Sequence, residues 1–455
     1  MSKYYLKADY DITSLKFHKT ENTIFVDIPM LSNNKLNYGL EHVKTILYNH
    51  NIFPSELGFD IITLATIVYL ADTRIKRAIH GQDSWTREII LQLPVSNVNL
   101  WNRQVKTIKR MLRFLTGDLW SIKFVKRDWK FKSNEETKEK TTLYNRASLF
   151  SGGMDSLIST INLMEQRENT LLFGHAGESL TKNAQTNIIS VLDEQYPKID
   201  HTLINLWMNF PDNYIPEGGN DSNTRSRSFL FIGFGIFSIT GIKNVKKLMV
   251  PENGLIALNV PLEMTRVGSF STRTTHPFYL TQWNNLLKNL GLDLSIYNPY
   301  WNKTKGEMAA ECLNKDVLFK TMRLSFSCSS PGKARWRGLS PQHCGYCVPC
   351  LIRRAAMYKA FGKDNTIYME TSIRHMQNNS ASGIGLQLRS FQYAIKRIKK
   401  LCNIEKISIH KSGPLPQNEN YLSELASIYK RGLLEVDTFI QDNLNNEECH
   451  RHHDL

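Results

Sequence analysis

The stretch that decides the fold is Ala147-Ser148-Leu149-Phe150-Ser151-Gly152-Gly153-Met154-Asp155-Ser156. An apolar run leads up to the two glycines, and apolar residues then recur at helical spacing, at Leu157, Ile158, Ile161 and Met164. This pattern predicts a strand, a tight turn and a helix. Such a junction directs backbone N–H groups and the positive end of the helix dipole at one small volume, which favours a bound anion such as phosphate.

The turn and the start of the helix supply the candidate nucleotide-binding residues, which are Ser151, Gly152, Gly153, Met154, Asp155, Ser156 and Leu157. The glycines allow the backbone to approach an anion closely, and the serine hydroxyls add hydrogen-bond donors. The loop lacks the Gly-Lys-Ser/Thr of the P-loop that serves γ-phosphate transfer. An ordinary turn with Asp155 as the helix N-cap is the alternative interpretation.

The order of expected elements predicts an α/β fold with a doubly wound parallel sheet. Strands are expected at 147–150, 171–174, 203–207 and 248–251, with helices at 180–195 and 227–240 between them. Before them, residues 1–131 are expected to form a separate α+β domain, with strands at 23–28 and 89–94 and a third through residue 124, and helices at 40–48, 61–77 and 101–115.

Four segments follow from this division. They are the α+β domain at 1–131, a charged linker at 132–144, a nucleotide-binding domain at 145–374, and a basic helical region with a frayed tail at 375–455. A chain of 455 residues is long enough for two or three domains.

Charge and hydropathy restrict the partners and the location. The net charge of +15 favours an anionic partner such as a nucleotide, RNA or an acidic protein. No apolar leader follows Met1, and the longest apolar stretch, 61–71, is too short to cross a bilayer. We therefore expect a cytoplasmic protein without a membrane partner, in which this stretch is a buried helix.

A second motif is Cys344-Gly345-Tyr346-Cys347-Val348-Pro349-Cys350, with Cys328 upstream. Three thiolates at three-residue intervals pair poorly with one another but can surround one cation, and a fourth thiolate completes a tetrahedral zinc site. Four cysteine ligands leave no open coordination position, which predicts a structural zinc ion. An iron–sulfur cluster and uncoordinated thiols are the alternatives. We expect His343 to lie behind the ligands or at the surface.

The glycine loop resembles the PP-loop of ATP pyrophosphatases, which cleave ATP between the α and β phosphates and form adenylates. Together with the cysteines it resembles the 7-cyano-7-deazaguanine synthase family of queuosine biosynthesis, often called QueC. The pieces that match, over residues 145–362, are the loop, Arg225 with Phe229 and Leu230, Lys305 with Glu307, Cys328, Cys344, Cys347 and Cys350, and Arg353.

The resemblance implies an activity and a set of site residues. The family activates 7-carboxy-7-deazaguanine with ATP and couples it to ammonia, so ATP, Mg²⁺, a 7-deazaguanine-type molecule and structural Zn²⁺ are the implied ligands. The loop would hold the ATP phosphates with Mg²⁺, Arg225 would offset their charge, and Lys305 would lie near the adenylate. Implied catalytic residues are Asp155, Ser156, Arg225 and Lys305. A surface position for Arg225 and for Lys305 is the alternative.

The chain also departs from that family. It has the additional residues 1–131, and the substrate segment Gly-Tyr-Pro-Asp-Cys-Arg is replaced by Pro251-Glu252-Asn253-Gly254-Leu255 and by a Thr-rich segment ending in His276-Pro277. Loops at strand ends line the crevice of such sheets, which makes Glu252, Asn253 and His276 candidate substrate contacts. A plain turn and a structural histidine are the alternatives.

The longer architecture resembles the QueC-like proteins of bacterial anti-phage operons, most of all the QatC family of the Qat system. This implies a role in defence, with partner proteins from the same operon, and we expect an amine on a partner protein in place of ammonia. Two alternatives stay open. One is a PP-loop enzyme that modifies RNA or tRNA, with 123–130 as a basic surface, although a lysine-protected edge strand is favoured there. The other is a non-catalytic, nucleotide-sensing scaffold for defence partners.

Overall fold

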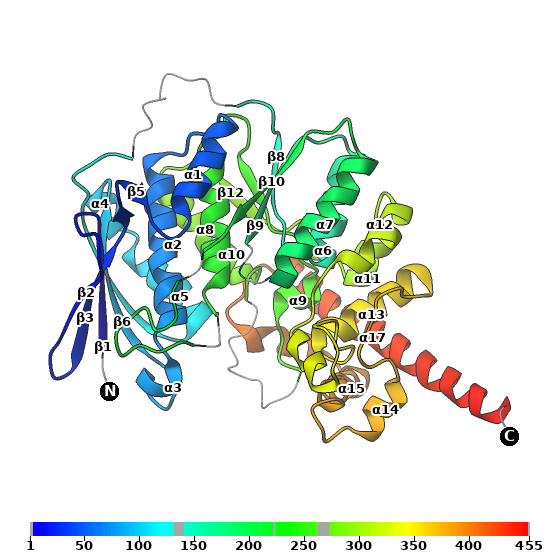
Figure 1. Cartoon of the computed structure of the whole chain (residues 1–455). Helices are drawn as coiled ribbons and strands as arrows, with labels where there is room; N and C mark the ends of the chain where they lie inside the picture. The colour runs from blue at the N-terminus through cyan, green and yellow to red at the C-terminus, as the bar shows by residue number, and fades with distance from the viewer. Residues whose placement is uncertain are drawn as a thin grey trace.

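The computed structural model describes residues 3–131, 141–262 and 273–453 except 176, 178, 209, 222 and 223, with side chains up to residue 445. Figure 1 shows two sheets with a layer of helices between them, and further helices beyond the second sheet. Of the expected linker at 132–144, residues 132–140 lie outside the described residues.

The second sheet is wholly parallel and carries the glycine loop. Its strands are β8 (Arg146–Leu149), β9 (Thr170–His175), β10 (His201–Leu206), β11 (Lys247–Met249) and β12 (Ser295–Tyr297), in the order β10-β9-β8-β11-β12. The four predicted strands are confirmed, and β12 is an addition. The chain passes from β8 to one side of the sheet and later returns to its other side, so the strand order reverses at β8. Ligands of open α/β sheets bind beyond the carboxyl ends of the strands at such a point.

Helices cover both faces of this sheet. On one face lie α6 (Met154–Glu165) and α7 (Ser179–Gln195), and on the other lie α8 (Arg227–Ile239) and α10 (Pro277–Asn289). In β9, Leu172 packs with α6, whereas Leu171 and Phe173 pack with α8. Successive side chains of a strand point to opposite faces, so the apolar run fills both cores.

The N-terminal sheet is mostly parallel, not the α+β arrangement expected. It consists of β1 (Lys3–Asp9), β2 (Lys16–Lys19), β3 (Thr23–Pro29), β6 (Glu88–Val95) and β7 (Leu119–Lys126), ordered β2-β3-β1-β6-β7, with only β2 antiparallel to its neighbour. The same unit contains five helices and a small hairpin. The helices are α1 (Leu40–Asn49), α2 (Glu56–Arg74), α3 (Arg77–His80), α4 (Val98–Asn102) and α5 (Val105–Thr116), and the hairpin consists of β4 (Leu31–Ser32) and β5 (Lys35–Leu36). The predicted helix 101–115 is divided between the end of α4 and α5, which are separated at Arg103 and Gln104.

This unit is not separate either, because its core continues into that of the second sheet. One hydrophobic cluster contains Leu6 and Ile62 from the N-terminal unit and Phe229 and Leu248 from the second. Helix α2 packs along α8, where a Cβ atom on Gly233 would lie only 3.0 Å from that of Ala65. The apolar stretch at 61–71 is therefore a buried helix, as predicted, but it is buried between two sheets.

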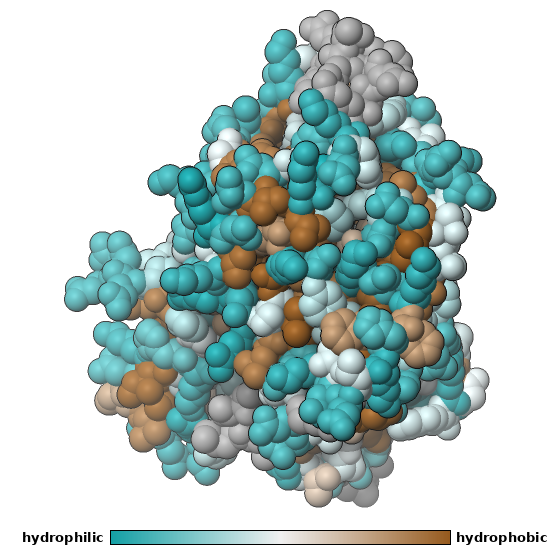
Figure 2. All heavy atoms as spheres, turned by 90° about the vertical axis from the view of Figure 1, so that its left-hand side faces the viewer, coloured by the Kyte–Doolittle hydropathy of each residue, from teal (hydrophilic) through white to brown (hydrophobic). Residues whose placement is uncertain are grey.

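The opposite face of the N-terminal sheet faces outward. Figure 2 shows this side of the molecule, where hydrophobic side chains lie scattered among hydrophilic ones. Strand β7 is an edge strand, as the lysines at 123 and 126 suggested. The neighbouring Arg127 and Phe124 are buried, and Trp129 contacts Tyr10 and Phe59.

The region expected to be helical, 375–455, contains α15 (Leu386–Lys400), α16 (Ile404–Ser408) and α17 (Glu419–His453) after α14 (Ile373–Asn378), as predicted. Four further helices precede it, namely α9 (Gly254–Leu258), α11 (Lys305–Ala310), α12 (Lys315–Thr321) and α13 (Val348–Phe361). Helix α17 packs against α9, α13 and α15 and extends to His453, through the segment expected to fray. None of the described helices combines the length and the apolar character needed to span a bilayer.

Buried ion pairs join α2 to its surroundings. Arg77 Nη2 lies 2.5 Å from Asp72 Oδ1, and Arg87 Nη2 lies 2.9 Å from the same atom and 2.6 Å from Asp118 Oδ2. Burial alone would raise the pKa of Asp72, but the two guanidinium groups lower it below its ordinary value. The other oxygen of Asp72 accepts the backbone N–H of Ser226 at 2.7 Å, just before α8.

We predict that Asp72→Ala lowers the free energy of unfolding by about 3–5 kcal/mol, because two buried arginines lose their shared carboxylate. The control is Glu88→Ala in the same unit, which removes an exposed ion pair with Lys3 and should cost less than about 1 kcal/mol. Urea unfolding curves of the two variants give the comparison. Equal losses would mean that the buried pairs do not stabilise this unit.

Candidate functional site

The glycine loop, residues 151–156, has the geometry that the sequence predicted. Gly152 has φ of 77°, a left-handed conformation that favours glycine, and Gly153 is the N-cap of α6. Asp155 is therefore not the N-cap but lies in the first turn. No described side chain caps that turn, and Ser151 and Ser156 face each other across the loop with their hydroxyl oxygens 3.3 Å apart. The first N–H groups of α6 are thus left for an anion.

The carboxylate of Asp155 brings three elements together. Its Oδ2 accepts the backbone N–H of Asn253 at 3.1 Å and the side-chain amide of Asn253 at 2.8 Å. Its Oδ1 lies 2.8 Å from Nζ of Lys305, the first residue of α11. All three side chains are at least nine-tenths buried. The structure therefore assembles three of the predicted residues beyond the ends of β8 and β11.

Glu252 lies beside this group. Its backbone N–H and carbonyl are both bonded to the side chain of Asn298, which follows β12. Its carboxyl group accepts a hydrogen bond from the Thr275 hydroxyl. Burial raises the pKa of Glu252 to about 7, and the negative charge of Asp155 acts in the same direction. A carboxyl group that titrates near neutral pH can exchange protons with a ligand.

Other predicted residues have mainly structural contacts. His276 is fully buried as the N-cap of α10, where Nδ1 accepts the Phe278 N–H at 3.2 Å and Nε2 lies 3.1 Å from the Ser412 hydroxyl. Burial lowers the pKa of His276 to about 3, so the ring is neutral. Glu307 caps α11 and pairs with Arg431 of α17.

Arg225 lies against the N-terminal unit. One of its N–H groups donates to the Thr116 carbonyl at 2.7 Å, and its guanidinium lies 4.2 Å from the ring centre of Trp85. Burial lowers the pKa of Arg225 to about 10, which still leaves it charged at neutral pH. Sequence reasoning did not find these contacts, because both join positions more than 100 residues apart in the chain.

Among the buried polar atoms without a hydrogen-bond partner in the described residues are three that sequence reasoning did not find. They are Nε2 of His175, Oε1 of Gln185 and Oδ1 of Asn205, at the ends of β9 and β10 and on α7. Gln185 also donates to the carbonyl of Phe150, next to the glycine loop, at 2.9 Å. Buried polar atoms without partners indicate a ligand or ordered water. In the sequence, only the position of polar residues at the ends of expected strands could have indicated these three side chains.

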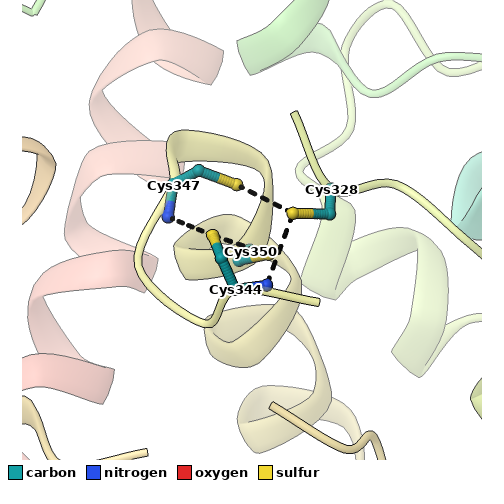
Figure 3. A group of neighbouring side chains, drawn as sticks. All are labelled: Cys328, Cys344, Cys347 and Cys350. Atoms are coloured by element: carbon teal, nitrogen blue, oxygen red, sulfur yellow. Dashed lines mark hydrogen bonds between the residues drawn. The ribbon is translucent and has the colours of Figure 1, made fainter. Parts of the chain in front are cut away.

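The four cysteines form one compact cluster, shown in Figure 3. All four sulfur atoms lie within 4.8 Å of one another, with Cys328 and Cys347 at 3.9 Å and Cys344 and Cys350 at 4.0 Å. Zinc–sulfur bonds of about 2.3 Å in a tetrahedron separate sulfurs by about 3.8 Å, so the cluster fits one zinc ion. A polynuclear iron–sulfur cluster would hold the sulfurs farther apart.

Backbone groups shape this cluster. The N–H of Cys344 lies 3.4 Å from Sγ of Cys328, and the N–H of Cys347 lies 3.3 Å from Sγ of Cys344. Gly345 has φ of 86°, and a Cβ atom there would lie 2.0 Å from the carbonyl of Glu370. His343 is buried behind the ligands, with Nδ1 3.7 Å from Sγ of Cys350.

A scan of protein-family models finds no match to this chain, and a search of curated proteins finds none either. The resemblance of the motif residues to the QueC-like family therefore stays a prediction.

We predict that the purified protein contains one zinc ion per chain and that Cys347→Ala lowers this to below about one-tenth, because three remaining thiolates leave the tetrahedron incomplete. Cys402→Ala removes an exposed cysteine outside the cluster and should keep the metal. Elemental analysis of the two variants provides the test. Equal metal contents would rule out this cluster as the zinc site.

The raised pKa of Glu252 predicts that the stability of the protein depends on pH. In the folded chain the pKa of the Glu252 carboxyl is about 7, whereas its ordinary value is 4.5. The folded state therefore binds this proton more tightly than the unfolded state, and the free energy of unfolding falls as the pH rises from 5 through 7. Glu252→Gln cannot ionise. We expect its free energy of unfolding to equal that of the wild type at pH 5 and to exceed it by about 2–3 kcal/mol at pH 8. Urea unfolding at the two pH values measures the difference, and the same effect at both would contradict the assignment.

Proposed function

We propose that this chain is a QueC-like, ATP-dependent enzyme that adenylates a 7-deazaguanine carboxylate and couples the activated acyl group to an amine. The observation that carries the proposal is the group formed at the switch point of the second sheet. There the glycine loop leaves the N–H groups of α6 open to an anion, and Asp155 of the same helix holds Lys305 and Asn253 beside it.

This arrangement suits cleavage of ATP between the α and β phosphates. A carboxylate oxygen of the substrate attacks the α-phosphorus, the bond to the bridging oxygen of the β phosphate breaks, and pyrophosphate leaves. The nitrogen of an amine then attacks the acyl carbon, AMP leaves and the nitrogen loses a proton. Such steps depend on positioning and on neutralising phosphate oxygens, for which backbone N–H groups and the Lys305 ammonium are suited.

The residues present also fit the metals that the family implies. Asp155 and the phosphate oxygens of bound ATP are the hard oxygen donors that Mg²⁺ prefers, and the four thiolates are zinc ligands. When bound, Mg²⁺ would neutralise charge on the phosphates, whereas zinc would be structural.

The biological setting is part of the proposal. The resemblance to QueC-like proteins of anti-phage operons supports a role in defence, with an amine of a partner protein as the acceptor. The altered loop around Glu252 and Asn253 is consistent with a different acceptor, because these residues follow β11 at the edge of the site.

The RNA-modifying alternative has less support from the structure. Its proposed surface at 123–130 lies on an edge strand and the residues after it, and Phe124 and Arg127 of this segment are buried. The scaffold alternative predicts nucleotide binding without cleavage, so product analysis separates it from catalysis.

The test is incubation of the protein with Mg-ATP and 7-carboxy-7-deazaguanine, with and without its operon partners, followed by identification of the nucleotide products. We predict AMP and pyrophosphate. Lys305→Ala should lower their formation about 100-fold, because a cation beside the phosphates is lost. Lys303→Ala, which removes an exposed lysine paired with Glu311, should change the rate less than about twofold. Formation of ADP and phosphate would refute the proposal.

A further inference from the structure

The segment at 325–328 runs along the glycine loop and ends in the cysteine cluster. The backbone N–H of Phe326 donates to the carbonyl of Gly152 at 2.8 Å, which ties the segment to the loop. One residue later, the Cβ atom of Ser327 lies 3.9 Å from the position that a Cβ atom would occupy on Gly153. Gly153 is the N-cap of α6, so Ser327 lies beside the helix terminus that the proposed phosphates would approach.

The Ser327 hydroxyl oxygen has no hydrogen-bond partner among the described residues, although it is buried. A buried hydroxyl without a partner is costly, and a phosphate oxygen is an acceptor that would satisfy it. The loop supplies two further hydroxyls from Ser151 and Ser156, but these already face each other, and Ser156 donates to the carbonyl of Gly153 at 2.9 Å. Ser327 is thus the hydroxyl beside the loop that is left for a ligand.

The cysteine cluster fixes this segment from the other side. The carbonyl of Ser325 accepts Nε2 of His343 at 3.2 Å, and its hydroxyl lies 2.8 Å from Nη1 of the buried Arg353. The other ring nitrogen of His343 lies 3.7 Å from Sγ of Cys350. Cys328 follows Ser327 directly and belongs to the cluster. A metal ion there would fix Cys328 at one end of the segment, while His343 beside the cluster is bonded to Ser325 at the other end.

We propose that Ser327 is a further phosphate-binding residue and that the metal-loaded cysteine cluster positions it against the glycine loop. The inference rests on the proposed function only in requiring that the loop binds the phosphates of ATP. It assigns the cysteine cluster a second role beyond stabilising the fold, as a support for the ligand site.

The first experiment measures the affinity of Mg-ATP and of inorganic pyrophosphate by calorimetry. Ser327→Ala should weaken binding of both by at least about tenfold, because one hydrogen bond to a charged group is lost. Ser327→Thr, which keeps the hydroxyl, should bind more tightly than Ser327→Ala. The control is Ser121→Ala on the exposed edge strand β7, which should match the wild type. Thermal melting of each variant checks that it is folded.

The second experiment removes the metal from the wild type with a chelator and follows amide hydrogen exchange. Peptides that cover residues 151–156 should exchange faster without the metal, and added zinc should restore their protection. If the wild type binds neither ligand, the proposed function fails and this inference fails with it. If the wild type binds both and Ser327→Ala binds them equally well, the inference alone is wrong. Unchanged exchange of the loop after metal loss would refute the positioning role.

Discussion

The candidate site depends on the buried carboxylate of Asp155. It stands in the first turn of α6 and joins Asn253 after β11 to Lys305 at the start of α11. Burying a carboxylate costs several kcal/mol unless donors surround it, and here two amide groups and one ammonium group offset that cost. The carboxylate therefore fixes the position of the glycine loop relative to two segments that are distant in the chain.

Two further parts of the molecule support this group from opposite sides. Residues 325–328, which end in the cysteine cluster, are bonded to the glycine loop through the N–H of Phe326 and the carbonyl of Gly152. The N-terminal unit packs α2 along α8, and Asp72 accepts the N–H of Ser226 just before α8 begins. Because one hydrophobic core runs from the first sheet into the second, the N-terminal unit contributes to the shape of the unit that carries the glycine loop.

Local features could be predicted from the sequence, and long-range contacts could not. The glycine loop and the turn at Cys344–Cys347 are short. The positive φ angles that they need fall on glycines within the motifs themselves, Gly152 and Gly345. The N-terminal sheet was misjudged because pairing partners do not appear in a strand's own pattern, and its parallel register joins distant segments. His276 and Arg225 could not be placed because their partners, Ser412 and Thr116, lie more than 100 residues away.

The most direct test of the account is exchange of labelled pyrophosphate into ATP, because it reports reversible cleavage between the α and β phosphates before any amine reacts. The account predicts label in ATP only when Mg²⁺ and 7-carboxy-7-deazaguanine are both present, with loss of the signal in Asp155→Ala. Exchange that does not depend on a carboxylate substrate, or label transfer only from phosphate through ADP, would contradict it.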